Sequence, residues 1–83
     1  MIISNNKYSL EFSYGKLFDI SNEIYGFLIY TSDTKSFTDN FIEHQHINIE
    51  FPCGRCYKGT LLTYNIFDLG GKYKIRIEMS LST

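Results

Sequence analysis

The chain has 83 residues, of which 43% are hydrophobic and 17% aromatic, and its formal net charge at pH 7 is −1. This length allows one domain, residues 1–83, because so short a chain cannot fill two separate cores. The apolar content argues against intrinsic disorder. The small net charge excludes a strong long-range attraction to nucleic acid or to acidic membranes.

The first part of the chain contains three segments with strand character. Over residues 7–14, apolar and polar side chains alternate, as they do when successive side chains point to opposite faces of a sheet. Gly15-Lys16 is expected to turn the chain into a short strand over residues 17–20. Residues 24–30 are apolar at almost every position and rich in β-branched and aromatic side chains, which predicts a central strand covered on both faces.

Residues 32–43 fit either a polar loop or one short helix within 36–44. Ser36 or Thr38 is the expected N-cap of such a helix. With Thr38 as the cap, Phe37 and Ile42 occupy the positions of a hydrophobic staple.

The C-terminal part predicts one further strand and a β-hairpin. Residues 45–51 alternate again, and Pro52 ends the run because it has no backbone donor. Residues 61–81 form the predicted hairpin, whose turn contains Gly70 and Gly71, residues suited to the positive φ of a tight turn. Its first arm is apolar on both sides, and its second arm alternates without interruption.

These segments give about six strands joined mostly by short turns, and short connections require antiparallel pairing. Two of the strands appear covered on both faces, so the sheet must fold over itself or be covered by the helical segment. The predicted fold is therefore mainly β: a compact antiparallel sandwich or open barrel, with the short helix within 36–44 as an option.

No secretory signal pattern is present, because polar residues 4–7 follow the first three residues, and no apolar run approaches the length of a membrane helix. The expected location is cytoplasmic, without membrane contact. In that compartment the two cysteines would be reduced thiols or metal ligands.

One group of residues has the chemistry of a metal site: His44, His46, Cys53 and Cys56. Alternate strand residues project to one side, and Cys-x-x-Cys is the spacing of a zinc knuckle, so together they supply four ligands for a structural zinc. Two alternatives stay open. In the first, the residues are ordinary surface histidines and free thiols; in the second, the cysteines form a disulfide or redox pair. The chain lacks the βαβ pattern that accompanies Cys-x-x-Cys in thioredoxin-like enzymes.

The sequence offers no catalytic constellation, because its carboxylates are scattered and no glycine-rich loop precedes a helix. We therefore expect a protein that is not an enzyme and needs no cofactor other than the zinc considered above. One alternative function is that of a small β-barrel that binds single-stranded nucleic acid. Basic residues line one face of the last predicted strand, and others are expected nearby on the preceding strand. The residues in that interpretation are Arg55, Lys58, Lys72, Lys74 and Arg76.

The favoured function is a small protein–protein interaction module whose partner is another protein or a second copy of the chain. Tyrosine suits interfaces, and so small a core cannot enclose every tyrosine of this chain. The expected surface tyrosines are Tyr25, Tyr30, Tyr57, Tyr64 and Tyr73. The usage of Asn, Lys, Ile, Tyr and Phe resembles the protein repertoire of AT-rich genomes, including many bacteria and their phages. Small cytoplasmic proteins of that kind are often inhibitors, such as toxin-immunity proteins or phage proteins that block host defences.

Overall fold

The computed structural model describes residues 1–81 and is mainly β. In chain order its elements are β1 (Ile2–Ser4), β2 (Ser9–Glu11), β3 (Tyr14–Ser21), β4 (Ile24–Thr31), α1 (Lys35–Asn40), β5 (His46–Glu50), β6 (Cys56–Asp68) and β7 (Tyr73–Leu81). The strands form one antiparallel sheet in the order β2-β1-β5-β6-β7-β4-β3. The described strands do not close into a barrel, so β2 and β3 are the two edges. The predicted compact antiparallel β-fold with one short helix is confirmed.

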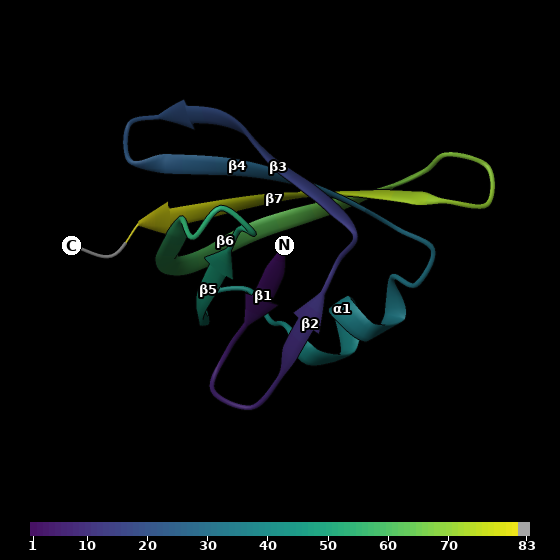
Figure 1. Ribbon diagram of the computed structural model, residues 1–83, viewed down its shortest axis with the longest axis horizontal. Helices are drawn as coiled ribbons and strands as arrows, with labels where there is room; N and C mark the ends of the chain where they lie inside the picture. Colours follow the sequence, from purple (N-terminus) through teal and green to yellow (C-terminus); the bar gives the residue numbers. More distant parts are fainter. Residues whose placement is uncertain (82–83) are drawn as a thin grey trace.

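Strand β6 folds this sheet over itself. Its first residues pair with β5, its remaining residues pair with β7, and the two ladders share only Gly59 and Thr60. The layer of β1, β2 and β5 therefore crosses the layer of β3, β4 and β7 at a steep angle (Figure 1). A β-bulge between Leu61 and Thr63 interrupts the β6–β7 ladder. Bulges bend a strand and increase its twist, which is what a strand passing between two layers needs.

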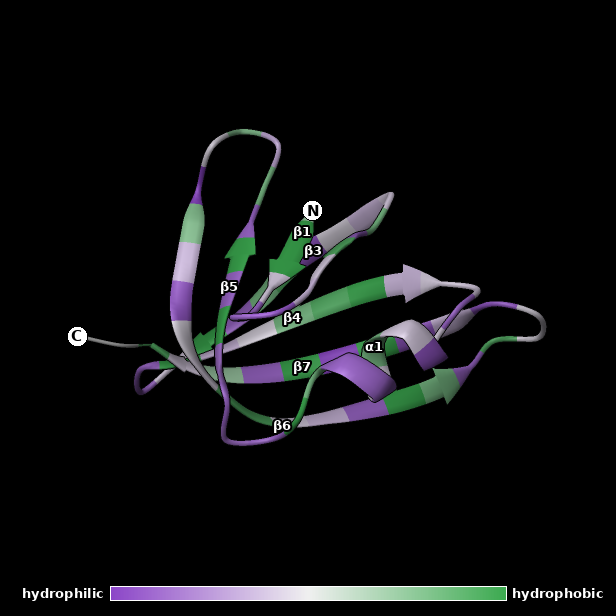
Figure 2. Cartoon of the chain, turned by 90° about the horizontal axis from the view of Figure 1, so that it is seen from below, coloured by the Kyte–Doolittle hydropathy of each residue, from purple (hydrophilic) through white to green (hydrophobic). Residues whose placement is uncertain are grey.

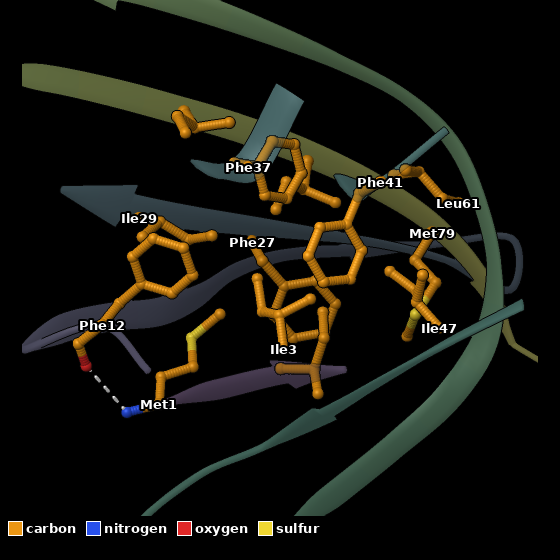
Figure 3. Packing of buried hydrophobic residues seen from close by; sticks show 13 residues of the cluster. Met1, Ile3, Phe12, Phe27, Ile29, Phe37, Phe41, Ile47, Leu61 and Met79 are labelled. Carbon is orange, nitrogen blue, oxygen red and sulfur yellow. Dashed lines mark hydrogen bonds between the residues drawn. The ribbon is translucent and has the colours of Figure 1, made fainter. Parts of the chain in front are cut away.

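The core lies on the concave side of the folded sheet. Along β7 the apolar residues alternate with polar ones (Figure 2), and Ile75, Ile77 and Met79 are fully buried. They meet buried residues of the other layer (Figure 3) in a cluster made of Met1, Ile3, Phe12, Phe27, Ile29, Phe37, Phe41, Ile47, Ile49, Leu61, Ile75, Ile77 and Met79.

Helix α1 covers the part of the concave side that β1 and β5 do not reach (Figure 2). Phe37 and Phe41 are buried and stacked, with ring centroids 5.2 Å apart. Phe37 also meets the ring of Tyr64 on β6 edge-on at 5.1 Å. A helix of 6 residues is too short to be stable alone, so this aromatic packing holds α1 in place.

The cap of α1 differs from the prediction. The helix begins at Lys35 with Thr34 at the N-cap position, and Thr34 makes no side-chain capping bond. Instead, the carboxylate of Asp33 accepts hydrogen bonds from the amide of Ser36 at 3.2 Å and from its hydroxyl at 2.5 Å. The expected staple of Phe37 and Ile42 is not formed, because Phe37 is buried within the helix whereas Ile42 is exposed.

The N-terminal strands also differ from the prediction. Residues 7–14 are not one strand, because the chain bends after β2 at Phe12 and Ser13 and then continues through Gly15 as β3. The main chain of Phe12 exchanges two hydrogen bonds with that of Met1, and the Met1 side chain packs against Gly15 (Figure 3 shows the Met1–Phe12 bond). Strand β1, which the sequence did not indicate, lies between β2 and β5.

Strand β4 is interior to the sheet, as predicted, but its two faces are covered unequally. Phe27 and Ile29 are buried in the core, whereas Leu28 and Tyr30 on the outer face are only half-buried.

Among residues 1–81, no helix has both the length and the apolar character needed to span a membrane.

Candidate interaction surface

The exposed apolar side chains of the protein concentrate on the β3–β4 hairpin. Tyr14, Ile20 and Ile24 are 54%, 59% and 40% exposed, and Phe18 is exposed as well. Strand β3 is 8 residues long and pairs only with β4, so the main-chain groups on its other side have no strand partner among the described residues. We name these four side chains, together with the free edge of β3, the edge surface.

Phe18 lies on the outer face of the sheet, at a second β-bulge between Leu17 and Asp19. Its ring lies over Gly26 of β4, where any larger residue would meet ring atoms at less than 3 Å. The ring extends as far as Arg76 of β7, whose guanidinium carbon lies 4.9 Å from the ring centroid. The glycine thus lets a side chain of the edge strand pack across β4 and become part of a broader face.

A second pair of the same kind lies on the outer face of the β6–β7 hairpin. Phe67 and Lys74 are directly opposite in the ladder, and the ammonium of Lys74 lies 4.9 Å from the centroid of the Phe67 ring. Each contact between a cation and an aromatic face contributes about 0.5–1 kcal/mol at exposed positions. Arg76 also contacts Glu78 at 3.7 Å, so the charge of this face is partly balanced.

A groove runs between the free edge of β3 and the β5–β6 connection. Its volume is about 460 Å³, and we name it the seam groove. The residues that matter to its chemistry are Lys16, Leu17, Phe51, Cys53, Arg55 and Tyr57. Phe51 and Tyr57 meet edge-on, with centroids 5.9 Å apart, and both contact Phe27 of the core. The floor of the groove is therefore an extension of the packed interior.

The connection on one side of the groove is a tight turn. The amide of Phe51 donates to the carbonyl of Arg55 at 2.9 Å, and the amide of Gly54 donates to the carbonyl of Phe51 at the same distance. Gly54 has a φ of 97°, a backbone conformation that residues with a side chain rarely adopt. These bonds fix Cys53 and Arg55 at the mouth of the groove.

The tyrosines expected at the surface are all half-buried. Tyr25, Tyr57 and Tyr64 pack against the core, with Tyr25 and Tyr57 in contact at 5.6 Å. Tyr30 lies on the outer face with its ring 5.3 Å from that of Tyr14, and Tyr73 begins β7. The two tyrosines that are exposed are Tyr8 and Tyr14, which the sequence did not single out.

The predicted zinc ligands are not brought together. His46 pairs with Thr60 at one end of β5, whereas Cys56 pairs with Glu50 at the other end. Four residues of strand separate these positions by about 13 Å. Both cysteines are free and exposed, and residues 1–81 contain no group of three or more His, Cys, Asp or Glu side chains placed to hold a metal ion. The structure therefore does not bring the four predicted ligands together, and zinc binding itself stays a prediction.

The predicted basic residues divide among four places. Lys74 and Arg76 share the outer face with Phe67 and Phe18, as described above. Lys58 opposes Asn48 on the β5–β6 ladder, and Lys72 belongs to the β6–β7 turn. Arg55 lines the seam groove instead.

Lys16, Phe18 and Ile20 are surface residues that the sequence interpretation missed. Gly15-Lys16 was expected to be a turn, which hid the continuity of β3 and therefore the position of Lys16 beside the groove. The useful signal was the exposed edge itself, and this becomes visible only once the strand order is known.

The chain matches no protein-family model, no curated protein and no solved structure.

Proposed function

We propose that this protein is a small, non-enzymatic interaction module that binds a partner protein through its edge surface. The observation that carries the proposal is the coincidence, on β3, of an unpaired strand edge with exposed Tyr14, Phe18 and Ile20. A free edge offers main-chain groups to another strand, and exposed apolar side chains beside such an edge add apolar area that a partner can cover.

Strand β3 also carries features that limit indiscriminate pairing. Lys16 and Asp19 place opposite charges along it, and the bulge at Phe18 interrupts its regular ladder. Charges and bulges on an edge strand disfavour open-ended aggregation. Their presence beside the apolar side chains favours a chosen partner over unlimited self-association.

An inhibitor, the type of interaction protein suggested by composition, needs only such a surface to act. It would block its target by covering it. Co-expression with the products of neighbouring genes tests this part of the proposal, since an immunity protein restores growth in the presence of its toxin.

The edge surface itself is tested by a charge-insertion pair. Ile20→Lys/Ile24→Lys places two lysines on the hairpin at exposed positions, so the fold is expected to remain intact. The matched control is Ile42→Lys/Leu69→Lys, which makes the same changes at residues that are 62% and 52% exposed but lie after α1 and in the β6–β7 turn. Circular dichroism checks that both variants are folded.

Immobilised wild-type protein and both variants are then compared by quantitative mass spectrometry of what they capture from source cells, and each hit is re-tested with purified protein. We expect a partner that binds wild type and control but is lost from the hairpin variant. Light scattering measures the molar mass of the protein in solution and so shows separately whether the partner is a second copy of the chain. Identical capture by all three proteins, with all three monomeric, would reject the proposal.

A second candidate function is binding of single-stranded nucleic acid by the outer face. Its specific support is the pairing of Lys74 with Phe67 and of Arg76 with Phe18, because such proteins combine base-stacking rings with cations that follow the phosphates. The test is the binding of oligodeoxythymidine at low salt, with affinity falling as salt rises. Absence of binding at low salt would reject this candidate.

A further inference from the structure

The seam groove combines three features that together define an occupant. One wall is the free edge of β3, the floor is apolar, and the two rims are basic. The described strands pair β3 with β4 alone, so an incoming strand would find unpaired amides and carbonyls beside Lys16 and Leu17. An extended segment that adds there would lie about 4.8 Å from β3 and continue the sheet beyond its free edge.

The charges of the groove are of one sign. Lys16 stands on the β3 side and Arg55 on the side of the β5–β6 connection, and no Asp or Glu of the described chain lines the groove. Neither cation forms an ion pair with a carboxylate within residues 1–81. Two unpaired cations flanking one groove favour an occupant that carries negative charge.

The floor selects for apolar groups at alternate positions. Leu17, Phe51 and Tyr57 are half-buried and pack against the core cluster, so side chains placed over them would lose contact with water. In an added strand every second side chain points toward this floor, and the others point outward beside Lys16. A segment that alternates apolar with acidic residues satisfies both requirements, because its apolar side chains face the floor and its acidic side chains face outward beside Lys16.

We propose that the seam groove binds an extended, acidic segment of the partner protein, which pairs with β3 and lays alternate apolar side chains over Leu17, Phe51 and Tyr57. This inference rests on the proposed interaction function and specifies the chemistry of the partner.

The chain contains its own reporter for occupancy of the groove. Cys53 lines the groove, whereas Cys56 is also exposed but does not line it. A segment in the groove should slow alkylation of Cys53 and leave Cys56 unchanged. The ratio of the two rates, measured by mass spectrometry of the alkylated peptides, is therefore internally controlled.

The experiment uses a random dodecapeptide library displayed on phage, selected in parallel on wild type and on Lys16→Glu/Arg55→Glu. The matched control target is Lys7→Glu/Lys58→Glu, which has the same net charge as the groove variant but keeps Lys16 and Arg55. We expect wild type and control to enrich peptides that alternate Asp or Glu with apolar residues. The best of these should bind the groove variant about tenfold more weakly or worse, because each exposed ion pair contributes a few-fold and reversal adds repulsion. It should also protect Cys53 but not Cys56.

Several results would overturn the inference. These are no enrichment on wild type, enrichment of basic peptides, equal binding to the groove variant, or equal protection of both cysteines. Protection of Cys53 by oligodeoxythymidine but not by the peptides would assign the groove to a phosphate chain instead. Protection that rises with protein concentration alone would assign it to a second copy. If the hairpin lysines abolish partner capture but the groove variant does not, the proposed function stands and the groove inference fails.

Discussion

Gly59 of β6 faces the main-chain carbonyl oxygen of Ser80 on β7 so closely that a β-carbon on Gly59 would overlap with that oxygen. Gly59 is also the point at which β6 pairs with both β5 and β7, opposite Ile47 and Leu81. The contact therefore lies where β6 passes from one layer of the folded sheet to the other. The absence of a side chain at this residue lets the three strands converge.

We predict that Gly59→Ala lowers the free energy of unfolding by about 2 kcal/mol or more, the upper range for overpacking a core. A carbonyl oxygen cannot rotate away, so β6 and β7 must separate. Gly15→Ala is the matched control, because its β-carbon would meet the side chain of Met1, which can move. Urea denaturation of both variants checks the prediction. Equal losses would show that the Gly59–Ser80 contact does not constrain the sheet.

The aromatic side chains are predicted to fall into two energetic classes. Phe37→Ala removes a fully buried ring, so we expect a loss of about 3 kcal/mol or more, together with detachment of α1. Phe67→Ala removes an exposed ring, and the expected loss is below about 1 kcal/mol. Urea or thermal denaturation measures both. Phe37→Leu provides an intermediate step if Phe37→Ala does not fold, and a loss for Phe67→Ala as large as for Phe37→Leu would contradict the assignment.

Strict alternation predicted the strands that have one buried and one wet face. In β5 and β7 the buried residues alternate with exposed or half-buried ones without interruption, as the sequence indicated. The turn between β6 and β7 was also predictable, because Gly70 and Gly71 have φ values of 82° and 94°. In these segments local chemistry and tertiary structure demand the same pattern.

Bulges explain where alternation failed. The first arm of the hairpin appeared apolar on both sides because the bulge between Leu61 and Thr63 shifts the register, so that Leu61 and Tyr64 both point toward the core. A one-residue shift moves every later side chain to the opposite face. At the other bulge it is Asp19 that changes face, whereas Phe18 points outward by the same alternation as Lys16. The contact of Phe18 with Arg76 could not be anticipated because it depends on β3 and β7 lying on either side of β4.

Long-range contacts explain the remaining differences. The bend after β2 depends on hydrogen bonds between the main chains of Phe12 and Met1. Gly15 lies within β3 and not in a turn, and its missing side chain leaves the space that the Met1 side chain occupies. The seam groove likewise joins Lys16 to Arg55, which are distant in sequence. The sequence could place Lys74 and Arg76 on one face, since that needs alternation only. It could not place two residues on opposite rims of a groove without the strand order.

The Asp33 carboxylate is predicted to make α1 sensitive to acid. The hydroxyl of Ser36, followed by its backbone amide, hydrogen-bonds this carboxylate and lowers the pKa of Asp33 from its ordinary value. A lowered pKa in the folded state means that the stabilisation is present above the pKa of the unfolded chain and is lost as pH falls through the folded one. The loss should therefore occur below about pH 4.

An NMR titration of the Ser36 amide tests this, and Asp33→Asn is the control because it keeps an acceptor oxygen but cannot titrate. We expect an inflection below the ordinary aspartate pKa in wild type and none in the variant. An inflection at or above the ordinary value would show that the Ser36 bonds do not persist in solution.

Asn5 is predicted to fasten the β1–β2 turn to the end of α1. Its side-chain oxygen accepts from the amides of Lys7 and Tyr8 at 2.9 and 2.8 Å, while its side-chain nitrogen donates to the carbonyl of Asn40 at 2.8 Å. Asn5→Asp keeps the two acceptor bonds but loses the donor, and Asn5→Ala loses all three. With about 0.5–1.5 kcal/mol for each net hydrogen bond, Asn5→Asp should cost about 1 kcal/mol and Asn5→Ala about 2 kcal/mol or more. Urea denaturation gives both values, and hydrogen exchange should report faster opening of α1 in each variant. A larger loss for Asn5→Asp than for Asn5→Ala would mean that the new negative charge, and not the missing bond to Asn40, governs this corner of the fold.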